Sequence, residues 1–161
     1  MLDLFLDYGW ALHSTLMVLT GIAMLRLGGS PERWIAIIGI GWVVVAHRIY
    51  HHLAPGSAWS PTFHAASDGF GLIMYLAVAL RANRLYPLVI AALQLVSVLA
   101  YVAWAIDHGH APISLPILAI APSWGILVCM IVGIVAHVRR GRRLGSYPDW
   151  TASPIWPRVS A

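Results

Sequence analysis

Five long apolar runs make up most of this chain, and they restrict its fold more than any other feature. They cover residues 10–27, 34–53, 61–80, 87–106 and 115–138. Crossing the hydrocarbon core of a bilayer takes about 20 helical residues, and a helix satisfies its own backbone hydrogen bonds in lipid. The sequence therefore predicts an all-α integral membrane protein with a bundle of about five transmembrane helices over residues 1–138.

The composition agrees with a chain that is solvated mainly by lipid. Of 161 residues, 60% are hydrophobic and 10% are charged, and the mean hydropathy is +0.77. A soluble domain of this size could not hide so much apolar surface in one core. The net charge of +4 does not indicate nucleic acid, because four of the ten basic residues are arginines that directly follow the last apolar run, at positions 139, 140, 142 and 143.

The arginines predict an orientation in the membrane. They flank the first connection, the third connection and the end of the last run (Arg26, Arg33, Arg81, Arg84 and the group at 139–143). Because basic residues favour the cytoplasmic side, we expect the N-terminus outside and the C-terminal tail inside. Arg48 is the exception, and we expect it to reach outward or to pair with Asp68. The arginine-only, alanine-rich and glycine-rich composition suggests a bacterial protein of the cytoplasmic (inner) membrane.

Residues 139–161 form a basic tail of different character. Its sequence, RRGRRLGSYPDWTASPIWPRVSA, contains three prolines and two tryptophans and has no helical periodicity. One interpretation is an extended segment that docks on a partner through Trp150 and Trp156. The other is an interfacial tail whose tryptophans rest among lipid headgroups.

Histidines are concentrated at one predicted end of the bundle. Seven of the eight are expected at the outer end (His13, His47, His51, His52, His64, His108 and His110), and His137 alone at the inner end. Such a grouping suggests a ligand, metal or proton site on the outer face. A simpler alternative is that histidine, being amphipathic, is tolerated at headgroup depth.

Two pairs of these residues have the spacing of metal ligands on a helix. His47 and His51 are four residues apart, as are His64 and Asp68, so each pair shares one helical face. Two facing helices could present all four side chains to one point. Three imidazoles and one carboxylate suit iron, copper or zinc better than calcium or magnesium.

A tetrapyrrole is the other cofactor that the histidines could bind. A b-type haem needs two histidines that face each other at similar depth, which His13 and His47 would do if the first two helices pack antiparallel. A chlorophyll-type pigment needs one histidine beside small residues, such as His47 after Ala46 or His137 after Ala136.

The run HRIYHH, His47 to His52, resembles one histidine box of the integral-membrane fatty acid desaturases and hydroxylases. The resemblance covers six residues and implies a di-iron centre. Those enzymes have several such boxes, normally on the cytoplasmic side, whereas this sequence has no second box of this kind. The family assignment is therefore not carried over to this chain.

Other polar residues and several glycines interrupt the apolar runs. Asp68 lies in the third run, where an ionisable group is a functional candidate, and it could pair with His64 or Arg48. Gln94 and Ser97 in the fourth run are expected to form hydrogen bonds between helices. Glycines in the second and third runs are expected to permit close helix packing (Gly39, Gly41, Gly69 and Gly71).

Three functions remain open from the sequence. No nucleophile motif, phosphate-binding glycine loop or CxxC pair is present, and the catalytic residues are unknown. We rank first a non-catalytic accessory or assembly subunit of a respiratory, photosynthetic or transport complex, with other membrane subunits and the lipid bilayer as partners. The alternatives are a metal- or haem-dependent redox protein and a small proton-linked transporter.

Overall fold

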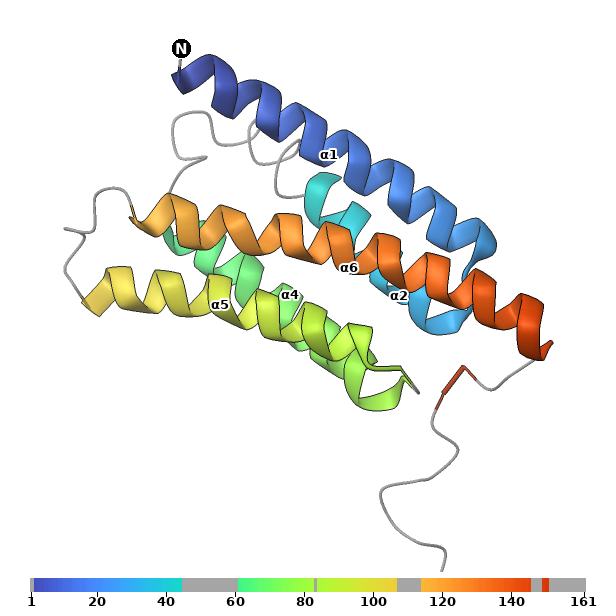
Figure 1. Ribbon diagram of the computed structural model, residues 1–161. Coiled ribbons are helices and arrows are strands. Elements are labelled where there is room, and N and C mark those ends of the chain that lie inside the picture. The colour runs from blue at the N-terminus through green and yellow to red at the C-terminus, as the bar shows by residue number, and fades with distance from the viewer. Residues whose placement is uncertain (1, 45–60, 83, 107–113, 146–148, 151–161) are drawn as a thin grey trace, which may run out of the picture.

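The computed structural model describes residues 2–44, 61–82, 84–106, 114–145 and 149–150, and this part of the chain contains five helices (Figure 1). They are α1 (Leu2–Leu27), α2 (Ser30–Trp42), α4 (Pro61–Arg81), α5 (Tyr86–Ile106) and α6 (Ser114–Leu144). An isolated antiparallel bridge between Ala82 and Trp150 is the only β-type pairing found in these residues. The predicted all-α fold is confirmed for the described residues.

Within the described residues, four helices are long and apolar enough to cross a membrane. The candidate spans are Tyr8–Leu27, Phe63–Arg81, Tyr86–Ile106 and Ala121–Arg143. They correspond to four of the five predicted runs and support an integral membrane protein. The remaining run, 34–53, is described only as far as residue 44, so the fifth crossing stays a prediction.

Two helices extend beyond the predicted spans. α1 begins at Leu2, eight residues before the expected start, and α6 continues to Leu144 through the group of arginines. Arginine is a good helix former, so α6 can continue after its apolar run ends. Gly145, at φ +70°, ends α6, and its N–H donates to the Gly141 carbonyl at 3.0 Å.

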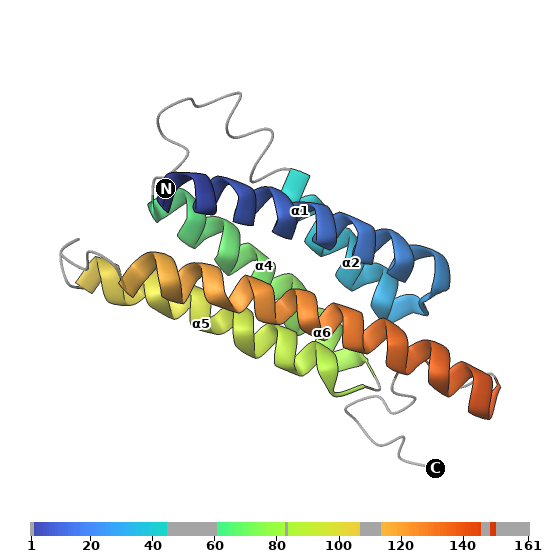
Figure 2. The ribbon, with the colours of Figure 1, turned by 45° about the horizontal axis from the view of Figure 1, so that its top comes forward.

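Consecutive helices run in opposite directions along the bundle (Figures 1 and 2). α1 contacts α2 and α6, α5 contacts α4 and α6, and α2 also contacts α4 and α6. The ends of α1, α4 and α6 and the starts of α2 and α5 therefore meet at one end, which we call the arginine-rich end. The opposite end, with the starts of α1 and α4, includes His64 and is called the histidine-rich end after the expectation from the sequence.

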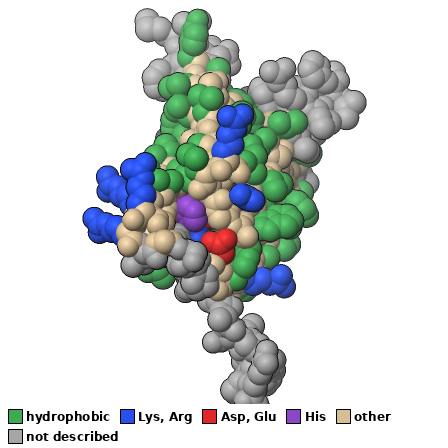
Figure 3. Space-filling model, turned by 90° about the vertical axis from the view of Figure 1, so that its right-hand side faces the viewer, with side chains coloured by type: hydrophobic (Ala, Val, Ile, Leu, Met, Phe, Trp, Pro, Cys, Tyr) green, Lys and Arg blue, Asp and Glu red, His purple; other side chains and the backbone are tan. Residues whose placement is uncertain are grey.

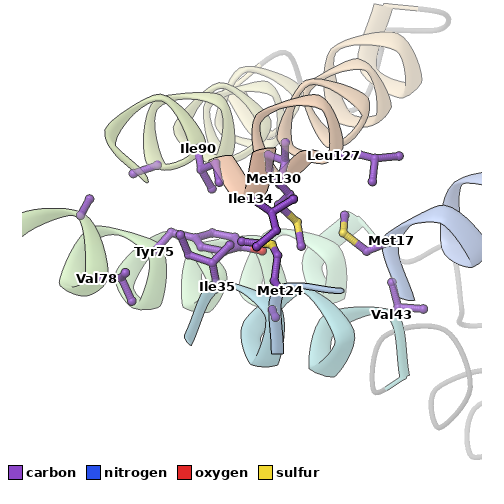
Figure 4. Packing of buried hydrophobic residues seen from close by; sticks show 14 residues of the cluster. Met17, Met24, Ile35, Val43, Tyr75, Val78, Ile90, Leu127, Met130 and Ile134 are labelled. Atoms are coloured by element: carbon purple, nitrogen blue, oxygen red, sulfur yellow. The ribbon is translucent and has the colours of Figure 1, made fainter. Parts of the chain in front are cut away.

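A core of aliphatic, methionine and tyrosine side chains lies between the helices (Figure 4). Met24, Ile35, Ile90 and Met130 are completely buried, and each comes from a different helix. Large apolar residues also cover the outside of the bundle, as on α5 (Leu88, Val89, Leu95, Val96, Leu99 and Val102). A soluble protein would not expose so continuous an apolar surface, whereas lipid or another subunit can cover it.

The closest glycine contacts are not at the positions expected from the sequence. A Cβ added to Gly41 or Gly69 would meet nothing within 4 Å, and one added to Gly39 or Gly71 would have only ordinary contacts. Within the helices the tight positions are instead Gly21, Gly125 and Gly133, and in the turn before α2 they are Gly28 and Gly29; at each of these a Cβ would fall within 3 Å of a neighbouring side chain. Spacing along the sequence could not reveal which side of each helix faces a neighbour.

Candidate functional site

The predicted metal ligands are only partly within the described residues. His47 and His51 lie outside them, as do His52, His108, His110 and Arg48. Among the residues that the structure places, no three His, Cys, Asp or Glu side chains are grouped so that they could hold a metal. A metal site formed by His47, His51, His64 and Asp68 therefore stays a prediction.

His13 packs against α6. It is 6% exposed, its Nε2 lies 3.2 Å from the Ser123 carbonyl oxygen, and its ring meets Trp124 edge-on at 4.9 Å between centroids. Because a carbonyl oxygen only accepts, Nε2 is the donor in this contact. Haem ligation through Nε2 would have to break this bond, and the second proposed ligand, His47, is not described.

His13 also lies deeper in its helix than the sequence indicated. We expected it one turn from the start of the first helix, but α1 begins at Leu2, about 16 Å of helix earlier. It is five residues beyond Tyr8, where the candidate span begins. His13 therefore lies at about the expected depth in the apolar segment. The additional residues at the start of α1 project beyond that segment.

His64 and Asp68 lie near the histidine-rich end of α4 and share a face, as their spacing predicted. The His64 ring stacks on Tyr101 of α5 at 6.4 Å, and Asp68 is 6% exposed. His13 and His64 are packed against different helices, α6 and α5.

Among the described residues, Gln94 of α5 forms a hydrogen bond with Asp68. The Gln94 Nε2 donates to Asp68 Oδ1 at 3.0 Å and also lies 3.3 Å from the Asp68 carbonyl oxygen. The predicted interhelical role of Gln94 is confirmed. Asp68 is also close enough to His64 and to the Trp42 indole for both to act on its charge. This cluster joins α2, α4 and α5 inside the bundle.

A second polar group lies at the arginine-rich end and was not predicted as a site. Its centre is Glu32, in the first turn of α2, which is completely buried. The Glu32 carboxylate forms an ion pair with Arg84, and its Oε1 accepts from the Tyr86 hydroxyl at 3.0 Å. Its Oε2 accepts from the Gly29 N–H at 3.1 Å and lies 3.7 Å from His137 Nδ1. Four groups thus surround one carboxylate.

Arg84 connects Glu32 to the C-terminal tail. Its side chain is 5% exposed, and it donates to Asp149 Oδ1 at 2.7 Å. Asp149 Oδ2 accepts from the Ser30 N–H at 2.9 Å, which satisfies an otherwise unpaired amide at the start of α2. The bridge between Ala82 and Trp150 holds the same tail segment beside the end of α4. We call Glu32, Arg84, Tyr86, His137 and Asp149 the inner polar network.

The charges in the inner polar network are nearly balanced. Two carboxylates share the guanidinium of Arg84, which leaves one negative charge when His137 is neutral and none when it is protonated. Burial raises the pKa of the Asp149 carboxyl, but the Ser30 N–H and the Arg84 charge outweigh it and hold that pKa below its ordinary value. Asp149 is therefore ionised at neutral pH.

The end of the bundle around this network is basic on its surface. Figure 3 faces this end and shows arginine side chains projecting around the polar centre. Those that project are exposed (Arg26, Arg33, Arg81, Arg139, Arg140, Arg142 and Arg143), whereas Arg84 is buried and paired. Arg84 is thus part of the internal structure rather than of the basic surface.

Sequence reasoning did not find Glu32 or Asp149, although one signal was present. The chain has only six acidic residues, so each acid near an apolar run is unusual. Glu32 follows the Gly28-Gly29 turn and begins a helix, where a glutamate ordinarily caps the exposed N–H groups. This capping role concealed the role of Glu32 in the network, because its side-chain partners are 52 to 105 residues away.

Comparison with known proteins adds no further constraint on the site. No protein-family model matches the chain, and no curated protein or solved structure is significantly similar to it.

Proposed function

We propose that this chain is a small polytopic subunit of a larger membrane complex and has no reaction of its own. The main support is the inner polar network, in which the most buried acid, Glu32, is surrounded by groups from four other positions. A carboxylate enclosed in this way fastens helices together and has no open side for a substrate. The exposed apolar surface of α5 offers a face for neighbouring helices as well as for lipid.

The proposal includes an orientation and a location. The exposed arginines near the ends of α1, α4 and α6 favour the cytoplasmic side, so the histidine-rich end faces outward. In a bacterium this corresponds to the inner membrane, with the outer end in the periplasm. The tail then extends on the cytoplasmic side, where Pro154, Trp156 and Pro157 can bind a partner.

Purification from the native membrane tests the subunit assignment. The tagged full-length chain, extracted in mild detergent and run on a native gel, should migrate well above its own mass with stoichiometric partners. A chain that ends at Thr151 keeps Asp149 and Trp150 and so should keep the inner polar network, but we expect it to lose the partner. Migration of the full-length chain as a monomer, in detergent that preserves other membrane complexes, would exclude the proposal.

Proton-linked transport is the second candidate, and the Asp68 cluster favours it. Asp68 is a buried carboxylate inside a candidate membrane span, beside His64 and Gln94. Ionisable groups in this position are frequent in proton pathways. Proton flux into liposomes should then be lost in Asp68→Asn and retained in Asp149→Asn, which changes an acid outside the span. Flux that is unaffected by Asp68→Asn removes this candidate.

A cofactor at the histidine-rich end is compatible with the subunit proposal. His64 and Asp68 would supply two of four ligands for iron, copper or zinc, with His47 and His51 as the others, and His13 with His47 would hold a haem. Elemental analysis and an absorption spectrum of protein from its native membrane test this directly. The double variant His47→Ala/His51→Ala should abolish the bound metal or haem band, whereas His137→Ala at the other end should not.

A further inference from the structure

We propose that the arginine face at the end of α6 binds the phosphate group of an anionic phospholipid. Ala136, Arg139, Arg140 and Arg143 line one shallow hollow of about 420 Å³. Their spacing of three, four and seven residues from Ala136 places them on one side of the helix. Three guanidinium groups around a small alanine can surround a phosphate with planar, paired N–H donors.

These arginines differ from Arg84 in what surrounds them. Arg139 and Arg143 are exposed and take part in none of the ion pairs found in the part of the chain that the structure describes. The sequence contains no acidic residue between Asp107 and Asp149. The nearby acids of this end, Glu32 and Asp149, are both held by Arg84. The positive charges of Arg139 and Arg143 are therefore available to an external anion.

The position of the face matches the headgroup layer of a membrane. The candidate span of α6 ends at Arg143, and Arg139 to Arg143 covers about 6 Å of helix. The headgroup region of one leaflet is roughly 5–8 Å thick. All three guanidinium groups therefore lie at the depth of lipid phosphates when α6 crosses the bilayer.

An apolar stripe continues from this face toward the membrane centre. Val132 and Val135 precede Ala136 and Arg139 by four residues each, and their side chains are 57% and 44% exposed. They can contact an acyl chain whose phosphate is held by the arginines. The combination of an anion site with an apolar stripe favours a phospholipid over a soluble phosphate or an acidic protein segment.

Native mass spectrometry of the full-length chain in detergent tests the proposal. Phosphatidylglycerol and phosphatidylcholine with identical acyl chains are titrated separately, and we expect much tighter binding of phosphatidylglycerol. The double variant Arg139→Gln/Arg143→Gln should lower its affinity roughly 30-fold, because each arginine near an anionic headgroup contributes a factor of roughly five. The control Arg26→Gln/Arg142→Gln removes the same charge from other faces and should retain the binding.

A second variant separates the shape of the hollow from its charge. Ala136→Trp fills the hollow and keeps all three arginines, so phosphatidylglycerol binding should also fall in this variant. Equal losses in both arginine double variants would show general charge attraction and overturn the proposal. The proposal also fails if Ala136→Trp binds normally, if inorganic phosphate competes at lipid concentrations, or if an acidic protein co-purifies in place of lipid.

Discussion

The guanidinium of Arg84 is paired with the completely buried carboxylate of Glu32, although the two residues are 52 positions apart. This pair joins the start of α2 to the start of α5. Arg84 also binds Asp149, so the same guanidinium attaches the tail to the bundle. Burying a charged pair has a desolvation cost that the mutual attraction only offsets, and removal of one partner leaves an uncompensated charge at a cost of about 3–5 kcal/mol.

Loss of Arg84 should therefore destabilise the bundle strongly. We expect Arg84→Gln to lower the free energy of unfolding by about 3–5 kcal/mol, because Glu32 would stay buried without its counter-charge. Unfolding in detergent micelles measures the effect. Arg81→Gln, an exposed arginine three residues earlier, is the matched control and should change little. The double variant Glu32→Gln/Arg84→Gln should recover part of the loss, and wild-type stability in Arg84→Gln would contradict the assignment.

The attachment of the tail should depend on acid pH. The folded pKa of Asp149 is below the unfolded value of about 3.9, so its stabilising contribution is fully present above that value. It is lost as the pH falls through the folded pKa. The stability difference between wild type and Asp149→Asn should therefore be constant from neutral pH to about pH 5 and shrink below pH 4. A stability difference that grows on acidification would show that folding raises the pKa of Asp149 instead of lowering it.

Gly133 should not tolerate a larger side chain. A Cβ at this position would lie 2.7 Å from the Tyr86 ring, and Tyr86 also donates to Glu32. We expect Gly133→Ala to destabilise by about 1–3 kcal/mol, since the ring must move and its hydrogen bond weakens. Gly69→Ala, where nothing lies within 4 Å, should be neutral or stabilising by up to about 1 kcal/mol. Equal changes in thermal stability for the two variants would contradict the close contact between Gly133 and Tyr86.

The contact between Asp68 and Gln94 should appear as an energetic coupling. We expect a double-mutant cycle with Asp68→Asn and Gln94→Leu to give about 0.5–2 kcal/mol, the range for hydrogen bonds between membrane helices. The same cycle between Asp68 and Asp149, at opposite ends of the bundle, should give a coupling near zero. Additive effects of Asp68→Asn and Gln94→Leu would mean that the bond does not contribute.

The proposed orientation predicts which positions an impermeant thiol reagent reaches in intact cells. In a Cys129→Ser background, Tyr8→Cys should react from outside, because Tyr8 is 71% exposed near the start of α1. Arg142→Cys, exposed at the other end, should react only after the membrane is opened. If Arg142→Cys reacted in intact cells and Tyr8→Cys did not, the chain would have the opposite orientation in the membrane.

The positions of the helices could be predicted because an apolar run in lipid must satisfy its backbone hydrogen bonds within itself. The expected runs 61–80 and 87–106 differ from α4 and α5 by one residue at a single end. Pro61 and Pro87 mark the starts of these helices in the sequence itself, and Arg81 marks the end of α4. α1 was harder, because its first eight residues extend the helix beyond the apolar run and carry no such signal.

Contacts between helices could not be predicted in the same way. The spacing of His64 and Asp68 correctly gave a shared face, but it could not show that Gln94 of α5 would donate to the Asp68 carboxylate. The rotation of each helix about its axis decides such partners. It depends on the whole core, including the close approach of Gly133 to Tyr86.

The amino-acid sequence alone was sufficient to predict a helical membrane chain with arginines near one end. Backbone hydrogen bonding in lipid and the length of an apolar run are properties of single segments, so the sequence contains them directly. It was not sufficient for the inner polar network. Glu32, Arg84, His137 and Asp149 belong to separate segments, and only packing of the helices brings their charges within bonding distance. Burial then makes these four residues depend on one another, because a charge that is enclosed in a low dielectric must keep its partner.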